Sequence, residues 1–185
     1  ESLADRDGIW DVPSVLERRV HFVKELSVIV ARDRYGNTAA YPVSEMAAHP
    51  GQHLLDRLIC PARIPADVSD RASAIARRIA DEIGMVGVLA VEMFLTRDGQ
   101  ILVNEIAPRP HNSGHHTIEA SVTSQYAQHI RCVLGLPLGS TELVRPAVMI
   151  NLIGEPGFDG PARYRGIEDA MRAEGVYVHL YGKSH

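Results

Sequence analysis

The chain has 185 residues, of which 45% are hydrophobic and 23% charged, and its formal net charge is -4 with neutral histidines. This composition excludes a disordered chain, a collagen-like repeat and a small disulfide-rich scaffold. A weakly acidic chain has no general field that would draw it to nucleic acid or to an acidic membrane, so we expect neither as a partner. Its two cysteines, Cys60 and Cys132, lie far apart without the spacing of a disulfide or zinc framework, which favours the cytoplasm.

The chain shows neither a membrane span nor a signal segment. A span needs about 18 consecutive apolar residues, and the longest candidate, residues 85–94, is interrupted by Glu92. We therefore expect a soluble protein. The chain starts at Glu1 rather than at a methionine, and its last residues directly follow an expected strand, so we expect both ends to be cut from a longer protein.

The first expected elements are a hairpin and a loop. Residues 15–31 are rich in Val, Leu and Ile and end at a turn sequence over residues 33–37, after which residues 38–43 read as the partner strand. Residues 44–65 contain three prolines and show no sustained period. We predict a loop there, with one short strand at residues 58–60.

The remaining elements alternate between helices and strands. Apolar residues recur at helical spacing over 68–83, with Asp67 as the expected N-cap and Gly84 as the stop. Strands over 86–95 and 101–106 flank Asp98-Gly99, which is a strong hairpin signal. A helix over 118–134, a strand over 147–153, a helix over 164–173 and a strand over 176–181 follow. This order predicts an α+β fold built on an antiparallel sheet.

Two glutamates on the second hairpin are the main candidates for chemistry. A loop of two or of four residues places Glu92 directly opposite Glu105. Opposed like charges destabilise a sheet, and apolar neighbours add a desolvation cost, so a cation should lie between them. Carboxylate oxygens favour Mg²⁺, with Mn²⁺ as an alternative, and Mg²⁺ takes its other ligands from water and substrate phosphates. The pair therefore predicts a site for a metal-bound nucleotide.

That prediction has a structural alternative. The two glutamates could lie on a solvated face and pair with Arg97 or Arg109. A three-residue loop with a bulge would also shift the register and separate them. The histidines that follow are a weaker metal signal, because Pro110 and Gly114 disfavour a regular ligand face, so we do not expect zinc.

The motifs around this hairpin resemble a known family. The segment 91–94 and the run 104–115, Asn-Glu-Ile-Ala-Pro-Arg-Pro-His-Asn-Ser-Gly-His, are similar to the ATP-grasp superfamily and, within it, to the N5-carboxyaminoimidazole ribonucleotide synthase family. The resemblance extends through residues 149–155 and 181–183. It implies the C-terminal subdomain of an ATP-grasp domain over 1–138 and part of a C-terminal domain over 139–185. The family's phosphate-binding lysine and Gly-rich loop lie in a preceding half that we expect to be missing.

The resemblance assigns residues to ATP and to the metal. Glu25 matches the acid that accepts from the ribose hydroxyls, and either His49 or His53 would lie near the nucleotide. The backbone that reads the adenine edge corresponds to Glu17, Arg18, Arg19 and Val20. The phosphates and the metal would meet Asn104 and Glu105, with Glu92 as the second metal ligand. Without the resemblance, Glu25 would read as a solvated strand residue.

The resemblance also assigns the substrate residues and the reaction. Arg109 would bind bicarbonate or carboxyphosphate, with His111 and Asn112 beside it, and Lys183 would contact a ribonucleotide phosphate. A guanidinium suits this role because its rigid fork engages a planar carboxylate. His115 and His116 would cap or pack on the following helix. The implied reaction is the ATP- and bicarbonate-dependent carboxylation of 5-aminoimidazole ribonucleotide by a homodimer.

Two alternative functions stay open on the sequence. One is a different ATP-grasp ligase that carboxylates another amine or activates formate. The other is a non-catalytic piece that serves as an interaction or dimerisation module. We expect the isolated 185-residue chain to be inactive in either case, since only one wall of the nucleotide cleft is present.

Overall fold

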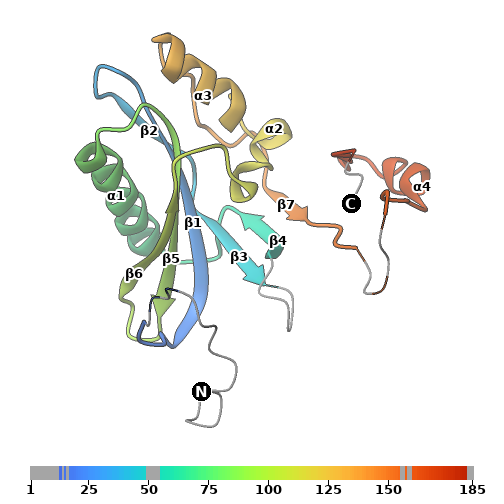
Figure 1. The fold of residues 1–185 in the computed structure, drawn as a ribbon, viewed down its shortest axis with the longest axis horizontal. Helices are drawn as coiled ribbons and strands as arrows, with labels where there is room; N and C mark the ends of the chain where they lie inside the picture. The colour runs from blue at the N-terminus through green and yellow to red at the C-terminus, as the bar shows by residue number, and fades with distance from the viewer. Residues whose placement is uncertain are drawn as a thin grey trace.

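The computed structural model describes residues 13, 15, 17–48, 55–154, 157 and 160–182, and they form an α+β fold around one antiparallel sheet (Figure 1). The strands are β1 (Phe22–Arg32), β2 (Thr38–Ala40), β3 (Ser44–Ala48), β4 (Leu55–Cys60), β5 (Gly87–Thr96), β6 (Ile101–Ala107) and β7 (Ala147–Ile150). Their order is β6-β5-β1-β3-β4-β7, and β2 pairs with β1. The helices are α1 (Ala66–Ile83), α2 (Thr117–Ala120), α3 (Gln125–Leu134) and α4 (Ile167–Met171). The expected fold class is confirmed.

The sheet buries apolar side chains on both faces, because successive residues of a strand point to opposite sides. One face packs against α1 through Leu26, Val28 and Val30 of β1 and their neighbours on β5. The opposite face packs against α3 through a second cluster that includes Ile29 and Cys132. Each fully buried leucine or valine contributes about 1.5–3 kcal/mol to folding.

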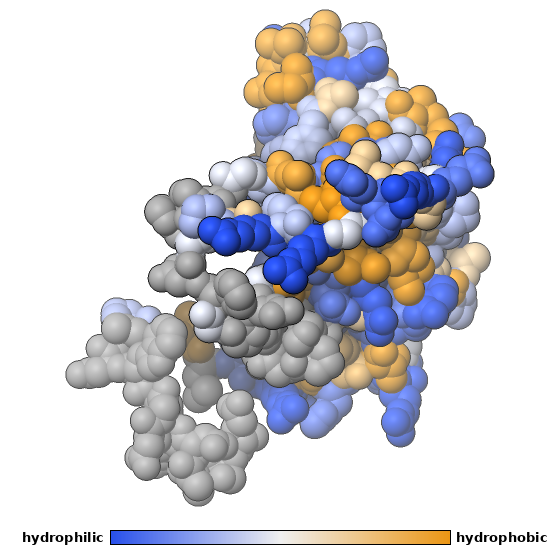
Figure 2. Space-filling model, turned by 90° about the vertical axis from the view of Figure 1, so that its right-hand side faces the viewer, coloured by the Kyte–Doolittle hydropathy of each residue, from blue (hydrophilic) through white to orange (hydrophobic). Residues whose placement is uncertain are grey.

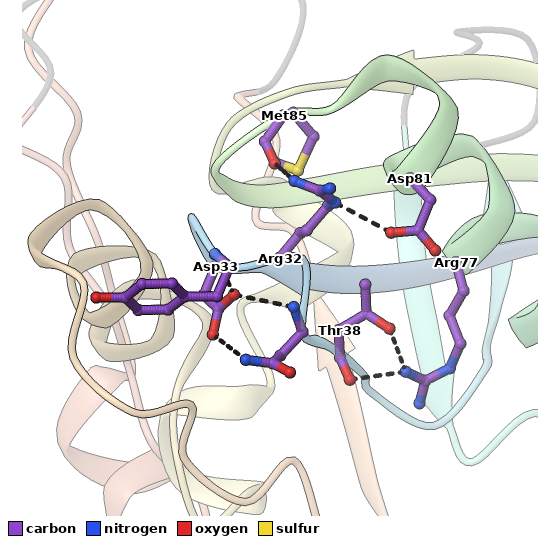
Figure 3. A network of polar contacts seen from close by, with 8 residues as sticks. Arg32, Asp33, Thr38, Arg77, Asp81 and Met85 are labelled. Atoms are coloured by element: carbon purple, nitrogen blue, oxygen red, sulfur yellow. Dashed lines mark hydrogen bonds and ion pairs between the residues drawn. The ribbon is translucent and has the colours of Figure 1, made fainter.

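Polar contacts fix α1 to the tip of the β1–β2 hairpin (Figure 3). The Arg32 guanidinium forms an ion pair with Asp81 at 3.0 Å and also donates to the carbonyl of Met85. Arg77 donates to both the carbonyl and the hydroxyl of Thr38 at 2.9 Å. Because these contacts join α1 to both strands of the hairpin, the sheet and its covering helix form one rigid support.

The segment predicted as a loop over 44–65 instead contains two paired strands. Met46 of β3 and Leu58 and Cys60 of β4 are buried in a third apolar cluster. That cluster is closed by Met149 on β7, which lies about ninety positions further along the chain and pairs with β4. The short strand predicted at residues 58–60 is confirmed as part of β4, but the loop prediction for the rest of the paired strands is wrong because the pairing that stabilises them is non-local.

Several expected boundaries also shift. The first strand begins at Phe22 rather than at residue 15, and α1 begins at Ala66, so Asp67 lies in the first turn instead of capping it. The stop at Gly84 is confirmed by its left-handed conformation, φ 67°. The strand β7 and the helix α4 are shorter than predicted, and residues 176–181 form no strand in the structure.

The helix predicted over 118–134 is divided in two. α2 ends at Ala120, and the chain then bends through residues 121–123 to Ser124, whose side chain accepts the Ala127 N–H and caps α3. Serine and threonine in this interval favour caps over helix interiors, which explains the break. Within the described residues, no helix combines the length and the apolar character that crossing a membrane requires.

Candidate active site

Glu92 of β5 and Glu105 of β6 face each other across neighbouring strands, as the sequence predicted. The hairpin reaches this register in an unexpected way. Its loop has three residues, since the Thr96 N–H donates to the Gln100 carbonyl, and Gly99 adopts φ 80° as such loops require. The loop prediction of two or four residues is therefore wrong.

A β-bulge on β6 restores the expected pairing. Near the loop, Met93 pairs with Val103, but the next pair is Glu92 with Glu105. Asn104 is the extra residue between them. The three-residue loop shifts the register by one residue, and the extra residue at the bulge shifts it back by one. The two carboxylates therefore lie opposite each other.

The surroundings of Glu92 and Glu105 disfavour a negative charge on both carboxylates at once. The Glu92 side chain is 18% exposed, and burial raises its pKa to about 7, with further contributions from the charges of Glu105 and Glu25. A divalent cation would reverse these effects, because a positive neighbour favours the charged carboxylate. The hard oxygen donors of Glu92 and Glu105 therefore fit Mg²⁺ or Mn²⁺.

His111 completes a compact group with the two glutamates. One ligand atom from each of the three residues lies within 4.8 Å of the others, and His111 Nε2 is 3.6 Å from a Glu92 oxygen. Burial lowers the pKa of His111 and the charge of Arg109 lowers it further, while Glu105 opposes them. The sequence linked His111 to bicarbonate, and the structure places it at the carboxylate pair.

The backbone of His111 is held by a buried glutamine from α3. Gln125 is fully buried, and its side-chain amide accepts the His111 N–H at 2.9 Å and donates to the His111 carbonyl at 2.7 Å. A Cβ on Gly114 would lie 2.4 Å from the Gln125 oxygen, so only glycine leaves room for this contact. Gln125 was not predicted from the sequence, because a buried glutamine has no local sequence signal.

The face that carries the glutamates also presents Glu25 and an aromatic pair. Glu25 pairs with Phe94 on β5 and so lies diagonally to Glu92. Phe22 stacks on Phe94 with ring centroids 4.5 Å apart and planes 10° from parallel, and Phe22 is 44% exposed. An exposed aromatic surface of this kind can support a flat purine ring. The signal that could have revealed Phe94 is its position two residues beyond Glu92 on the same strand face.

The predicted hinge directly precedes β1 without regular secondary structure. Three of its residues are exposed and Val20 is half-buried. Its four residues are Glu17, Arg18, Arg19 and Val20. These four residues come just before Phe22 in the chain. Phe22 and Glu25 both lie on β1, so the hinge adjoins the strand that carries the predicted ribose acid.

Other predicted site residues lie close to the pair or outside the described residues. Arg109 is exposed, and its guanidinium donates to the Pro110 carbonyl at 3.1 Å. The side-chain oxygen of Asn112 is buried and accepts no hydrogen bond from the residues that the structure describes. Lys183, His49 and His53 lie outside the described residues.

Two family models match the chain. A family model described as "ATP-grasp domain" matches residues 3–126, and one described as "Phosphoribosylaminoimidazole carboxylase C-terminal domain" matches residues 147–185. The N5-carboxyaminoimidazole ribonucleotide synthase of Bacillus subtilis is 50% identical over 141 residues, which cover 76% of this chain and 37% of that protein. The chain thus spans well under half the length of this curated relative.

Solved structures agree with these matches. The N5-carboxyaminoimidazole ribonucleotide synthetase of Thermotoga maritima superposes with a TM-score of 0.90 at 50% identity, covering 100% of this chain and 49% of that one. The Aspergillus clavatus N5-carboxyaminoimidazole synthase, solved with ADP and 5-aminoimidazole ribonucleotide, gives a TM-score of 0.69 at 35% identity. It covers 75% of this chain and 37% of that chain.

Proposed function

The chain belongs to the ATP-grasp family, and we propose that its residues serve the ATP- and bicarbonate-dependent carboxylation of 5-aminoimidazole ribonucleotide. The observation that carries the proposal is the Glu92–Glu105 pair with His111 beside it, in a chain 50% identical to an N5-carboxyaminoimidazole ribonucleotide synthase. A relative crystallised with ADP and 5-aminoimidazole ribonucleotide supports the choice of substrates. The product would be N5-carboxyaminoimidazole ribonucleotide, in purine biosynthesis.

The proposed reaction has two steps. A bicarbonate oxygen attacks the γ-phosphorus of ATP and ADP leaves, which forms carboxyphosphate. The substrate amine then attacks the carboxyl carbon of carboxyphosphate and phosphate leaves; alternatively, carboxyphosphate first breaks down to CO₂ and phosphate and the amine attacks CO₂. In both routes the nitrogen gives up a proton as the new carbon–nitrogen bond forms. No protein nucleophile takes part, so the protein contributes positioning and charge stabilisation.

Nucleotide binding would use the face that carries Glu25. The backbone of residues 17–20 would read the adenine edge, the Phe22–Phe94 pair would support the ring, and Glu25 would accept from the ribose hydroxyls. Stacking on an aromatic side chain typically contributes about 1 kcal/mol beyond simple burial.

The phosphate end would lie at the carboxylate pair. Glu92 and Glu105 would hold Mg²⁺ or Mn²⁺, with Asn104 toward the phosphates. The ion would neutralise charge on the transferred phosphoryl group. Arg109 would bind bicarbonate or carboxyphosphate with its bidentate fork, with His111 and Asn112 beside it.

We further propose the domain division and the assembly. Residues 1–138 would be the C-terminal subdomain of the ATP-grasp domain, and residues 139–185 part of a smaller C-terminal domain that carries Lys183 to the ribonucleotide phosphate. A homodimer in the cytoplasm is the proposed assembly. Apolar side chains gather at the upper end of the molecule, where α3 lies (Figures 1 and 2), and Ile130 and Leu134 are 53% and 65% exposed there. Analytical sedimentation of the protein, which gives its mass in solution, tests the proposed homodimer.

A chimera tests the function directly. The matching segment of the Bacillus subtilis synthase is replaced by this chain, and ADP release is measured with bicarbonate and 5-aminoimidazole ribonucleotide. We expect turnover, and a loss of about 100-fold or more in Arg109→Ala. The hairpin-tip variant Arg97→Ala is the matched control and should keep its rate. Turnover that needs formate or another amine, or full activity in Arg109→Ala, would contradict the proposal.

A further inference from the structure

Two buried serines connect the centre of the sheet to the His111 ring. Ser27 of β1 is 2% exposed and lies directly opposite Glu92 in the sheet, and Ser113 is 1% exposed on the short 3₁₀ helix η2 (Asn112–Gly114). Their hydroxyl oxygens are 2.7 Å apart. The Ser113 hydroxyl oxygen is in turn 2.9 Å from His111 Nδ1. The three side chains therefore form one continuous hydrogen-bonded chain.

One backbone contact identifies His111 Nδ1 as a hydrogen-bond acceptor. The Ser113 N–H points at His111 Nδ1, with 3.3 Å between the nitrogens. A nitrogen that accepts this N–H must present its lone pair, so Nδ1 carries no proton. With Nδ1 as an acceptor, its 2.9 Å contact with the Ser113 oxygen is a hydrogen bond only if the Ser113 hydroxyl donates, so the N–H and the hydroxyl share the Nδ1 lone pair. The Ser113 oxygen accepts from the Ser27 hydroxyl as a result.

The other ring nitrogen must therefore carry the proton. In a neutral imidazole, the hydrogen bond at one nitrogen decides which nitrogen is protonated. Nε2 is the atom that faces the carboxylates, 3.6 Å from Glu92. It presents an N–H there and has no lone pair to offer to a metal ion.

We propose that Ser113, supported by Ser27, is a positioning residue that fixes His111 as the Nε2–H tautomer, so that His111 donates a hydrogen bond to an anionic oxygen beside Glu92 and Glu105 and does not bind the metal. A metal-binding histidine shows the reverse arrangement, in which its second nitrogen donates to a carboxylate or a carbonyl. Only the identity of the anion, bicarbonate or carboxyphosphate, rests on the proposed function.

This assignment separates the roles of three clustered side chains. The two carboxylates would hold the cation, while His111 would supply a directed N–H that stabilises negative charge as it develops on the substrate. The two serines are buried, so they would not contact the substrate themselves. Their contribution acts through the ring orientation and the proton position of His111.

The experiment is ¹⁵N NMR of the histidine rings in the 185-residue chain, with long-range couplings that assign each ring nitrogen. In the wild type, we expect Nδ1 of His111 at the shift of an unprotonated nitrogen and Nε2 at that of a protonated one. Ser113→Ala keeps the backbone N–H but removes the hydroxyl donor, so the averaged Nδ1 shift should move part of the way toward the protonated value. Ser27→Ala should move it less, because it removes only the second hydroxyl.

The matched control is Ser44→Ala. Ser44 is a buried serine directly opposite Ser27 on β3 and lies outside the chain of hydroxyls that leads to His111. Its removal should leave both His111 shifts in place. Addition of Mg²⁺ alone should leave the Nε2 proton in place as well.

Three results would overturn the proposal: a protonated Nδ1 in the wild type, unchanged shifts in both Ser113→Ala and Ser27→Ala, or loss of the Nε2 proton on adding Mg²⁺. The wild-type spectrum shows which ring nitrogen of His111 is protonated, so the proposal is tested even if one variant fails to fold. In the active chimera, Ser113→Ala should lower kcat about 10-fold with an unchanged KM for ATP. An inactive chimera would refute the proposed function and leave the NMR result standing.

Discussion

Two glutamines of α3 make the same contact on different segments, and this allows a matched test of how the His111 backbone is held. The Gln125 side chain hydrogen-bonds to the N–H and the carbonyl of His111. The Gln128 side chain hydrogen-bonds in the same way to the N–H of Gly139 at 2.8 Å and to its carbonyl at 2.9 Å. Both side chains are fully buried. Replacing either by leucine keeps a similar volume and removes both backbone hydrogen bonds; Gln125→Leu also removes a 3.0 Å contact with His115 Nδ1.

The expected cost follows from the backbone groups that lose their partners. Each buried polar group left unsatisfied costs about 1–3 kcal/mol, so two give about 2–6 kcal/mol. His111 and Gly139 are only partly buried, so water recovers part of this cost. We expect about 2–4 kcal/mol for each of Gln125→Leu and Gln128→Leu, a large share of a typical stability of about 5–15 kcal/mol.

The two variants should differ at the site. Urea unfolding at pH 7.5 gives the two free-energy losses, and the His111 ring resonances report on the site. Gln125→Leu should shift those resonances and broaden them, whereas Gln128→Leu should leave them in place. A loss below about 1 kcal/mol for Gln125→Leu, or equal shifts in both variants, would refute the idea that Gln125 holds the site in position.

Three further predictions concern pH, metal and nucleotide. Burial lowers the pKa of His116 to about 4 from its ordinary value of 6.5. Between these two pH values the His116 ring is protonated in the unfolded chain and neutral in the folded chain. The free energy of unfolding should therefore fall by about 3 kcal/mol between pH 7 and pH 4, and His116→Phe should remove that part of the slope in urea titrations. Without metal, Glu105→Gln should raise stability by a few tenths to about 1 kcal/mol, because it relieves the repulsion with Glu92, and it should abolish any stabilisation by Mg²⁺ in thermal melts. In the chimera, Phe94→Ala should weaken ATP binding about 10-fold by calorimetry and leave the KM for bicarbonate unchanged; a lower affinity for bicarbonate instead would contradict the nucleotide role.

Local sequence patterns were enough for the elements that carry their own signals. The α1 helix has an apolar stripe and a glycine stop, and the β5–β6 hairpin has Asp98-Gly99 between two apolar runs. The Glu92–Glu105 pairing predicted from hairpin symmetry is confirmed, although a three-residue loop and a compensating bulge that the sequence did not predict produce it. Residues that depend on short-range order were therefore predictable.

Residues that depend on distant partners were not predictable. The strands β3 and β4 are stabilised by a cluster that includes Met149, and Gln125 reaches back fourteen residues to His111. Ser27 and Ser113 meet across 86 positions. A hydroxyl or an amide has no periodic pattern, so its buried partner is visible only once the fold is known.

The bulge at Asn104 explains why the carboxylate pair forms where it does. A one-residue change of register moves every following side chain to the opposite face of a sheet, so the three-residue loop alone would have turned Glu105 away from Glu92. A compensating bulge is tolerated best on an edge strand, and β6 is the last strand in the sheet order. The bulge lies between Val103 and Glu105, next to the pair it restores. Loop and bulge therefore act together, and the position of the candidate metal site depends on both.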